Sequence, residues 1–346
     1  MADKILRVDA ASFLDLSLKI PVADVRSPGE FRQGRIPGAV NIPLFDDSQR
    51  AMVGALYTHQ GRAEAAISGI GMIAPELSGK MKKAMELSQG GDLLLYCWRG
   101  GMRSESMAWL FSAAGMKPVI LEGGYKAYRN FILSSLAEKK KYIILGGLTG
   151  SGKTSVLKEL ESLGQQITDL EGLACHKGSA FGALGQKEQP SSEHFANLLY
   201  SEISFKNPSK PLWLEDESKN IGTVFMPDPF YSNMRDAPVI ALMIPAEVRL
   251  PRLIEEYTVF PKDELLASIQ KISRRLGGDK THTASEAVLH DDFETAIKIV
   301  LDYYDIAYRY GLSKRDKEKV IVIETDTADT RTNALRVLEA AQGLLT

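Results

Sequence analysis

A glycine-rich stretch near the middle of the chain restricts the fold more than any other feature. Residues 146–154 read GGLTGSGKT, which satisfies the spacing Gly-x4-Gly-Lys-Ser/Thr. An apolar run, 142–145, precedes the stretch, and a helix-forming segment, 155–160, follows it. A strand, a glycine loop and a helix in this order predict a phosphate-binding loop. The residues expected to bind phosphate or a metal-linked phosphate are Gly147, Gly150, Ser151, Gly152, Lys153 and Thr154.

Each residue type in this loop has a physical role. The glycines let backbone N–H groups close around phosphate oxygens. Lys153 supplies a point charge, and the Thr154 hydroxyl is a ligand for Mg²⁺. The alternative is a glycine-rich turn that binds nothing, and the flanking strand and helix argue against it.

A second strand–loop–helix stretch lies at residues 93–104, LLLYCWRGGMRS. Its apolar run ends at Cys97, and a helix is expected to start near Arg103. This places a thiol at the positive end of a helix dipole, which favours the reactive thiolate. The residues expected to form an anion cradle around it are Arg99, Gly100, Gly101, Arg103 and Ser104. A buried structural cysteine is the alternative, but such a thiol needs no anion cradle.

Size and composition set the broad class. The chain has 346 residues, of which 44% are hydrophobic and 25% charged, which indicates two globular domains. A net charge of −2 does not by itself indicate a nucleic-acid binder. Two cysteines, Cys97 and Cys175, are too few for a disulfide framework and fit a reducing compartment. Residues 1–9 lack the apolar core of a signal peptide, and no apolar window is long enough for a membrane helix, so we expect a cytoplasmic protein.

Apolar runs alternate with helical stretches along most of the chain. We therefore predict an α/β protein, with a first domain over 1–137 and a second, doubly wound parallel-sheet domain over 138–346. Ala137 to Lys141 form a polar bridge between them. The strands expected in the second domain are 142–145, 166–170, 212–218, 238–244 and 319–324. The helices expected there include 246–259, 262–276, 284–310 and 328–343.

Further polar residues are candidates for the site. Strand 212–218 ends in carboxylates, and Glu215, or second Asp216, would meet a metal beside the phosphate loop; a solvated acidic loop is the alternative. Loop 169–182 contains glycines, an acid pair, His176 and Lys177, which is typical of a substrate loop. Lys271, Arg274 and Arg275 precede a tyrosine-rich helix and are candidate RNA contacts, although an amphipathic helix with core contacts explains the same pattern.

The first domain resembles rhodanese-like domains. The resemblance lies in segment 24–43, in the Cys97 loop and in Glu122 to Tyr125, and it implies a compact α/β unit whose cysteine carries sulfur or selenium. Arg35 stands where many rhodaneses have histidine, and Arg103 is one position further from the cysteine than in common sulfurtransferase loops. The wider loop suits a phosphate-sized anion, and its Cys-x5-Arg spacing also fits cysteine phosphatases.

The fused motifs, with segments 171–182 and 213–222, resemble bacterial tRNA 2-selenouridine synthases over essentially the whole chain. The resemblance implies a tRNA substrate with 2-thiouridine at the wobble position of its anticodon arm. It also implies geranyl diphosphate and selenophosphate as co-substrates, and a selenophosphate-supplying enzyme as a partner. Cys97 would then serve the selenium step. The loop at 147–154 would hold a diphosphate, and whether that diphosphate belongs to geranyl diphosphate or to a nucleotide stays open.

Two other functions fit the same motifs. One is an NTP-dependent small-molecule kinase with a rhodanese-like regulatory or sulfurtransferase domain. The other is a non-catalytic RNA-binding scaffold, and intact Cys97 and Lys153 argue against it.

Overall fold

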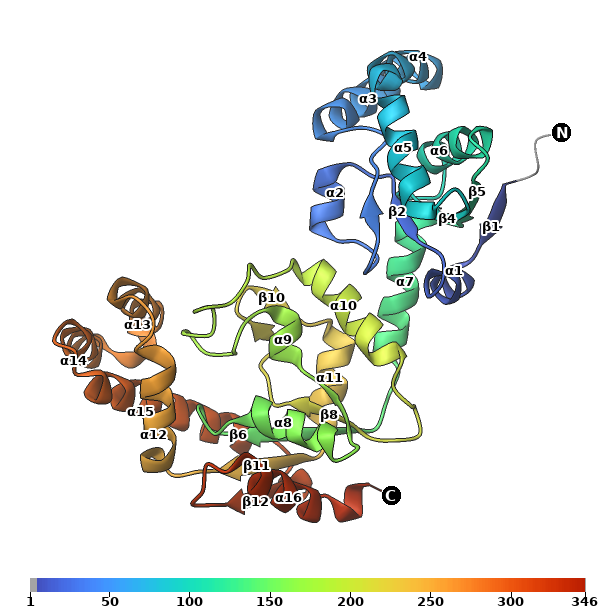
Figure 1. Cartoon of the computed structure of the whole chain (residues 1–346). Helices are drawn as coiled ribbons and strands as arrows, with labels where there is room; N and C mark the ends of the chain where they lie inside the picture. Colours follow the sequence, from blue (N-terminus) through green and yellow to red (C-terminus); the bar gives the residue numbers. More distant parts are fainter. Residues whose placement is uncertain (1–4, 346) are drawn as a thin grey trace. The chain divides into compact units, whose positions relative to one another are not determined.

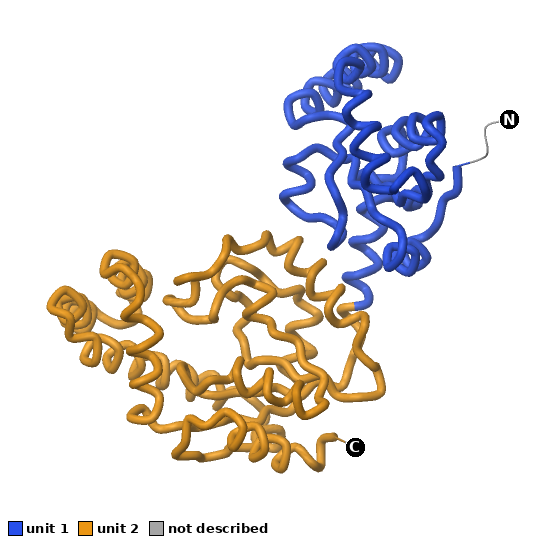
Figure 2. The backbone as a smooth tube through the Cα atoms, viewed as in Figure 1, with its two compact units in different colours: residues 1–135 blue, residues 136–346 orange. Residues whose placement is uncertain are grey.

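The computed structural model describes residues 5–345. The chain divides into two compact units, residues 1–135 and 136–346 (Figure 2). The division falls inside α7, which spans Gly124–Ala137. Among the described residues, no helix is both long and apolar enough to span a membrane.

The first unit is built on a five-stranded parallel sheet with the order β1-β5-β4-β2-β3. The strands are β1 Leu6–Val8, β2 Val22–Asp24, β3 Val40–Asn41, β4 Asp92–Tyr96 and β5 Lys117–Leu121. The helices before β4 are α1 Ala10–Ser17, α2 Pro28–Gln33, α3 Asp47–Gln60, α4 Arg62–Ile73, the 3₁₀ turn η1 Ala74–Glu76 and α5 Leu77–Ser88. Those after it are α6 Met102–Ala113 and α7.

Strand β4 lies in the middle of this sheet, and its residues from Leu93 to Tyr96 are apolar and buried. Leu93 and Leu95 pack with Met107 and Phe111 of α6 in one buried cluster, and Cys97 belongs to the same cluster. Central parallel strands are covered on both faces, which explains the uninterrupted apolar run in the sequence. The cysteine therefore sits at the carboxyl end of the central strand.

An ion pair inside this unit fixes the segment beside β4. Arg26 and Asp24 are both fully buried, and the Arg26 Nη2 atom lies 2.6 Å from both Asp24 Oδ2 and the Gly34 carbonyl oxygen. The guanidinium also lies 3.8 Å from the centroid of the Tyr125 ring. Asp24 and Arg26 thus form a fully buried ion pair.

Replacing Arg26 with methionine is expected to destabilise the first unit by about 3–5 kcal/mol, because Asp24 then remains buried without a counter-charge. Hydrogen exchange of amides in β2 and β4 measures this unit separately from the second. A double variant, Asp24→Asn with Arg26→Met, should recover a large part of the loss because no bare charge stays buried. Equal protection in the wild type and the single variant would contradict the prediction.

The second unit is also built on a parallel sheet, with the order β12-β11-β6-β8-β7, and carries a small antiparallel ribbon. The sheet strands are β6 Tyr142–Gly147, β7 Gln166–Thr168, β8 Leu212–Glu215, β11 Val239–Met243 and β12 Val320–Glu324. The ribbon is β9 Asn220–Ile221 with β10 Val224–Phe225. The first helices are α8 Lys153–Ser162, α9 Leu170–Ala174, α10 Ser192–Ser204 and α11 Asp228–Asp236. The later ones are α12 Ala246–Tyr257, α13 Lys262–Leu276, α14 Gly278–Leu289, α15 Phe293–Ser313, the 3₁₀ turn η2 Lys317–Lys319, α16 Thr330–Ala340 and the 3₁₀ turn η3 Gln342–Leu344.

Helices cover both faces of this sheet. Alternate residues of β6, such as Ile143 and Leu145, pack with α8 and α16, while Tyr142 and Ile144 pack with α10 and α11. This confirms the predicted doubly wound α/β architecture. Helices α12 to α15 gather beside the sheet and have apolar clusters of their own (Figure 1).

The predicted single helix over 284–310 is wrong. The structure has two helices there, α14 and α15, with a turn between them. Asp291 adopts a left-handed conformation with φ of +61°, and the Asp292 side chain accepts a hydrogen bond from the Thr295 N–H. An aspartate N-cap starts a new helix, and the apolar periodicity continued across it and hid the break.

Candidate active sites

The Cys97 loop is shaped by close contacts that only glycine permits. Gly100 has φ of +66°, and a Cβ placed on it would lie 2.6 Å from the Leu121 carbonyl oxygen. A Cβ on Gly124 would lie 2.4 Å from the Cys97 carbonyl oxygen. The loop after β4 therefore rests directly on the turn after β5. This explains why the two glycine-containing segments belong to one site.

The thiol lies at the base of this loop, where α6 begins. Cys97 is 3% exposed, and its Sγ lies 3.3 Å from the Ser104 Oγ and 3.9 Å from the Gly101 carbonyl oxygen. The N–H groups in the first turn of α6 have no partner within the helix. The Ser104 hydroxyl donates to the Gly101 carbonyl oxygen at 3.0 Å, so in this arrangement it accepts from the thiol, and it must rotate to donate to a thiolate. The predicted position of Cys97 at a helix N-terminus is thus present, although the side chain is more enclosed than the sequence suggested.

The two arginines of the predicted cradle lie differently. Arg103 Nη1 is 2.6 Å from Glu30 Oε2, and the Arg103 side chain is 18% exposed. Burial opposes ionisation of Glu30, but the hydrogen bond and charge of Arg103 outweigh it and hold the pKa of Glu30 below its usual value. Arg99 is exposed. Arg103 therefore has a carboxylate partner that the sequence did not reveal, and anion binding by both arginines stays a prediction.

The phosphate loop follows β6 and leads into α8, as expected. Gly150 and Gly152 have φ of +78° and +76°, and Lys153 is the first residue of α8. Lys153 Nζ donates to the Gly147 carbonyl oxygen at 3.2 Å. The Ser151 Oγ is buried and has no hydrogen-bond partner within residues 5–345. Free helix N–H groups, a lysine and an unpaired hydroxyl around one loop suit an anion with several oxygens.

Two carboxylates meet the Thr154 hydroxyl. Thr154 Oγ1 lies 2.8 Å from Glu215 Oε1 and 3.0 Å from Glu171 Oε2. The Glu171 N–H also donates to Glu215 Oε2 at 3.2 Å. The structure thus brings the first predicted acid, Glu215, to the phosphate loop. It adds Glu171, which the sequence marked only as part of an acid pair in a substrate loop.

Asp216, the second predicted acid, lines the cavity around the phosphate loop but is held by other partners. Its carboxylate pairs with Arg315, lies 3.6 Å from Arg235 Nη1 and accepts from the Tyr308 hydroxyl at 3.5 Å. Arg315 Nη1 in turn donates to the Arg235 carbonyl oxygen at 2.9 Å. These bonds tie β8 to α11 and to the end of α15. Asp216 therefore stabilises the frame of the site, while Glu215 lies at the loop.

Glu215 holds its proton unusually strongly. Burial, followed by the charges of Glu171 and Asp169, raises its pKa to about 8. Burial and the charge of Glu171 also raise the pKa of Glu217. Neighbouring buried carboxylates repel one another, and this repulsion falls when one of them keeps its proton or when a cation binds between them.

We expect the thermal stability of the protein to fall as the pH rises from 6 to 8. An unfolded glutamate loses its proton near pH 4.5, whereas folded Glu215 keeps it until about pH 8. The stabilisation from this group is fully present below pH 4.5 and is lost as the pH rises through 8. Between pH 6 and 8 the free energy of unfolding should fall by roughly 2 kcal/mol, which lowers Tm by about 4–8 °C. Thermal unfolding in a chelator measures it. Glu215→Gln should flatten the slope, and equal slopes would contradict the assignment.

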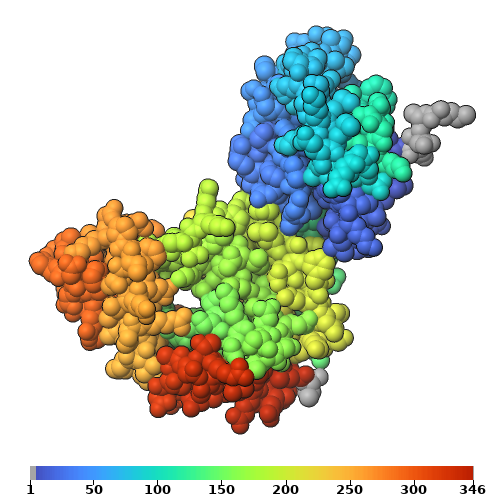
Figure 3. All heavy atoms as spheres, viewed as in Figure 1, coloured from blue at the N-terminus to red at the C-terminus, as the bar shows by residue number. Residues whose placement is uncertain are grey.

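A cavity of about 790 Å³ surrounds the phosphate loop. Figure 3 shows the surface of the second unit hollowed between residues around 150–180 and residues 246–276. Arg275, a predicted RNA contact, lines this cavity, whereas Lys271 and Arg274 are exposed on the same helix and do not line it. Arg252 also lines it, and a Cβ on Gly152 would lie 2.5 Å from the Arg252 Nη1. No sequence pattern points to Arg252, because α12 lies about a hundred residues from the loop.

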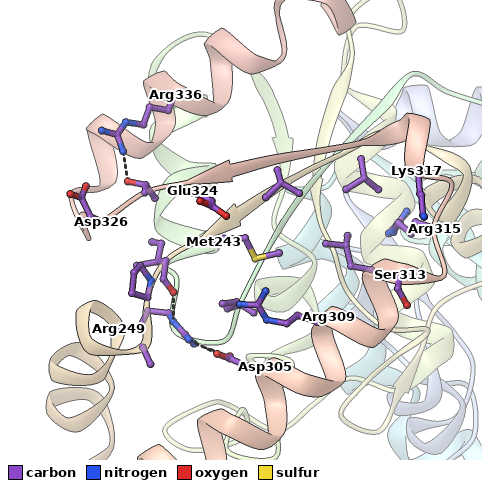
Figure 4. A pocket seen from close by; sticks show the side chains of 18 residues that line it. Met243, Arg249, Asp305, Arg309, Ser313, Arg315, Lys317, Glu324, Asp326 and Arg336 are labelled. Carbon is purple, nitrogen blue, oxygen red and sulfur yellow. Dashed lines mark hydrogen bonds and ion pairs between the residues drawn. The ribbon is translucent and has the colours of Figure 1, made fainter.

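A second cavity, of about 930 Å³, lies along edge strand β12 (Figure 4). Its most buried cation is Arg249, which donates to the Thr149 carbonyl oxygen at 2.7 Å and to the Ile244 carbonyl oxygen at 2.8 Å. Arg249 Nη1 also donates to Asp305 Oδ1 at 3.0 Å. Arg249 therefore holds the phosphate loop between β11 and α15.

No cluster of three or more histidine, cysteine, aspartate or glutamate side chains is placed to hold a metal ion within residues 5–345. Thr154 and Glu215 nevertheless provide the hard oxygen donors that Mg²⁺ prefers. Mg²⁺ usually binds through one or two protein oxygens, substrate phosphates and water rather than in an all-protein cage. The donors present fit such an ion.

The fold and the two loops define a class of protein in which a rhodanese-like domain is joined to a P-loop domain. Comparison with known families agrees: residues 9–131 match the rhodanese-like domain, and residues 140–337 match the tRNA 2-selenouridine synthase AAA domain. Proteins named tRNA 2-selenouridine synthase align along most of the chain. The one from Shewanella frigidimarina is 35% identical, with 87% of this chain and 90% of the relative covered. The one from Sulfurovum sp. is 34% identical, with 85% of this chain and 89% of the relative covered. The one from Psychromonas ingrahamii is 33% identical, with 86% of this chain and 89% of the relative covered.

The chain belongs to the tRNA 2-selenouridine synthase family, and it is an enzyme. This favours the rhodanese interpretation of the Cys97 loop over the cysteine phosphatase one, and the family function over the kinase. Among solved structures, the N-terminal domain of a putative ATP/GTP binding protein from Clostridium difficile 630 is 36% identical. That match covers 38% of this chain and 99% of that domain, with a TM-score of 0.34.

Proposed function

We propose that the enzyme converts wobble 2-thiouridine in the tRNA anticodon arm to 2-selenouridine in two steps, with geranyl diphosphate and selenophosphate as co-substrates. One observation supports this division more than any other. The chain has two separate loops at helix N-termini, one before α6 with a thiol and one before α8 with a lysine. Each co-substrate contains phosphate, and each loop type suits a phosphate oxyanion.

The first step is assigned to the phosphate loop. The sulfur of 2-thiouridine attacks carbon 1 of the geranyl group, the carbon–oxygen bond breaks, and diphosphate leaves with the bonding electrons. Lys153 and the N–H groups of residues 150–154 would stabilise the charge that develops on the leaving oxygen. Arg252, which lies over Gly152, would add a second fixed charge there.

Mg²⁺ would be held by the Thr154 hydroxyl and the Glu215 carboxylate, which lie 2.8 Å apart. When bound, the ion supplies charge that screens a diphosphate leaving group. Glu215 would then lose its proton to become a ligand. The residues of this chain bind and orient the diphosphate whether or not the ion contributes.

The second step is assigned to Cys97. S-alkylation turns the sulfur into a better leaving group. The selenium of selenophosphate adds at carbon 2, geranyl thiolate leaves with the electrons of the carbon–sulfur bond, and water then cleaves the selenium–phosphorus bond to release phosphate. Cys97 would assist the displacement, because carrying the selenium as a perselenide would require a two-electron oxidant. The Ser104 hydroxyl, 3.3 Å from the sulfur, would stabilise the thiolate once it rotates from the Gly101 carbonyl oxygen toward the sulfur.

Recognition of tRNA is assigned to cationic side chains on α13. Lys271, Arg274 and Arg275 are exposed there, and Arg275 reaches the cavity around the phosphate loop. Exposed cations contact the RNA backbone without reading sequence. A selenophosphate-supplying enzyme is the expected partner, and the cytoplasm is the expected compartment.

Mass spectrometry of tRNA nucleosides tests the proposal. The purified protein, tRNA bearing 2-thiouridine, geranyl diphosphate and selenophosphate together should yield 2-selenouridine. Without selenophosphate, the S-geranyl nucleoside should accumulate; without geranyl diphosphate, the 2-thiouridine should persist. Phosphoryl transfer from ATP, with no change in the nucleoside in the complete mixture, would instead support the kinase alternative.

A further inference from the structure

The cavity around the phosphate loop changes character from one wall to the other. The loop side is polar and carries both cationic and acidic side chains, whereas the remaining lining includes Leu253 and Tyr257 of α12 and Tyr304 of α15. Leu253 lies directly against the loop, since a Cβ built on Gly150 would be 2.7 Å from the Leu253 Cδ1. An apolar wall therefore begins within one side chain of the place where a phosphate would bind.

A narrow apolar chamber lies behind this wall. Thr149, Leu253, Tyr257 and Tyr304 line both the phosphate cavity and the chamber, so the two spaces adjoin. The deeper lining comes from α13, α14 and α15 and includes Ile269, Val288, Ala296 and Val300. The free volume of the chamber is about 20 Å³, roughly the space that one water molecule occupies.

The chamber lies where two apolar clusters meet. Ala296 and Val300 belong to one cluster, and Leu253, Ile297 and Leu301 belong to the other. Side chains at such a boundary can change rotamer without breaking a hydrogen bond. The chamber can therefore widen for an apolar group that enters from the phosphate cavity.

The chamber has too few polar side chains to bind a polar ligand. Within residues 5–345, its only polar lining side chains are Thr149, Tyr257 and Tyr304, and the Tyr304 hydroxyl already accepts from the Ala180 N–H at 2.7 Å. A nucleotide base placed here would leave donors and acceptors unpaired, which costs binding energy. A hydrocarbon tail has no such groups, and its burial is favourable.

We propose that this chamber and its wall bind the isoprenoid tail of the diphosphate substrate and select its length. The diphosphate lies in loop 147–154, the first isoprene unit lies against Leu253, Tyr257 and Tyr304, and the terminal unit enters between Ala296 and Val300. This inference rests on the proposed function, in which the substrate is geranyl diphosphate. It explains how a phosphate loop common to nucleotide-binding proteins can take a prenyl diphosphate.

Substrates of different tail length test the inference. Ala296→Leu fills the chamber, so the ratio of kcat/KM for geranyl diphosphate to that for dimethylallyl diphosphate should fall at least about tenfold. Leu301→Ala enlarges it and should raise the ratio for farnesyl over geranyl diphosphate. Both ratios are measured within one preparation, so the folded fraction cancels.

Ala287→Leu is the matched control. Ala287 is buried in the same apolar cluster as Ala296 but does not line the chamber, so its ratio should stay within about twofold of the wild type. Inorganic diphosphate should bind Ala296→Leu as it binds the wild type, since only the tail is affected.

Two failures are distinguishable. If the wild type transfers geranyl but Ala296→Leu and Ala287→Leu leave the ratio equally unchanged, the tail chamber is wrong and the proposed function stands. If the wild type transfers no prenyl group from any diphosphate, the proposed function is wrong, and the chamber inference fails with it.

Discussion

Lys153→Ala should lower geranyl transfer to 2-thiouridine by at least about a hundredfold. Lys153 is the one side chain of loop 147–154 that carries a positive charge, and it lies at the N-terminus of α8 where diphosphate charge would develop. Loss of one such group typically costs 10²–10³-fold in rate. The measurement is the initial rate of S-geranyl nucleoside formation at saturating tRNA.

The same variant should still convert tRNA that was geranylated beforehand, because selenation is assigned to the other loop. Lys298→Ala is the control, since Lys298 is an exposed lysine paired with Glu294 on α15 and lines none of the cavities described above. Unchanged affinity of Lys153→Ala for geranyl diphosphate would contradict the assignment of this loop.

Cys97→Ala should give the opposite pattern. Selenation of pre-geranylated tRNA should fall by at least about a thousandfold, because the loop contains no other thiol that could replace Cys97. Geranyl transfer should stay close to the wild-type rate. Mass spectrometry should then find the S-geranyl nucleoside accumulating in the presence of both co-substrates.

Cys175→Ser is the control for Cys97→Ala. Cys175 caps α9 in a left-handed conformation, with φ of +51°, and does not line the phosphate cavity. Its serine variant should retain both steps. If Cys97→Ala loses geranyl transfer together with selenation, the division of labour between the two loops is incorrect.

Local patterns were enough to predict the two loops and the architecture around them. Cys97 and Lys153 each follow an apolar strand and begin a helix within a few residues, so the chemistry and the backbone are encoded in one short segment. The same holds for strand β11 and helix α13, which lie within one residue of the bounds expected. Such segments are predictable because their hydrogen bonds and periodicity are local.

Contacts between distant segments were not predictable in this way. Glu30 holds Arg103 across 73 residues, and Glu171 reaches Thr154 from a loop that the sequence marked only for its composition. Asp216 was a candidate beside Glu215, but it is paired with Arg315, which lies 99 residues further along the chain. Adjacent carboxylates at the end of a strand point to opposite faces, and only the packing of α11 and α15 decides which of them meets the loop.

The sequence by itself determined that this chain has two loops between a strand and a helix on parallel α/β sheets, because each loop is set by its own strand, glycines and helix. The tertiary structure alone decided what surrounds them. Three residues of α12, a helix remote in sequence, contact the phosphate loop. Arg249 donates a hydrogen bond to it, Arg252 lies next to Gly152, and Leu253 packs against Gly150. Substrate shape depends on these walls, and walls form only when distant helices bury their apolar faces together.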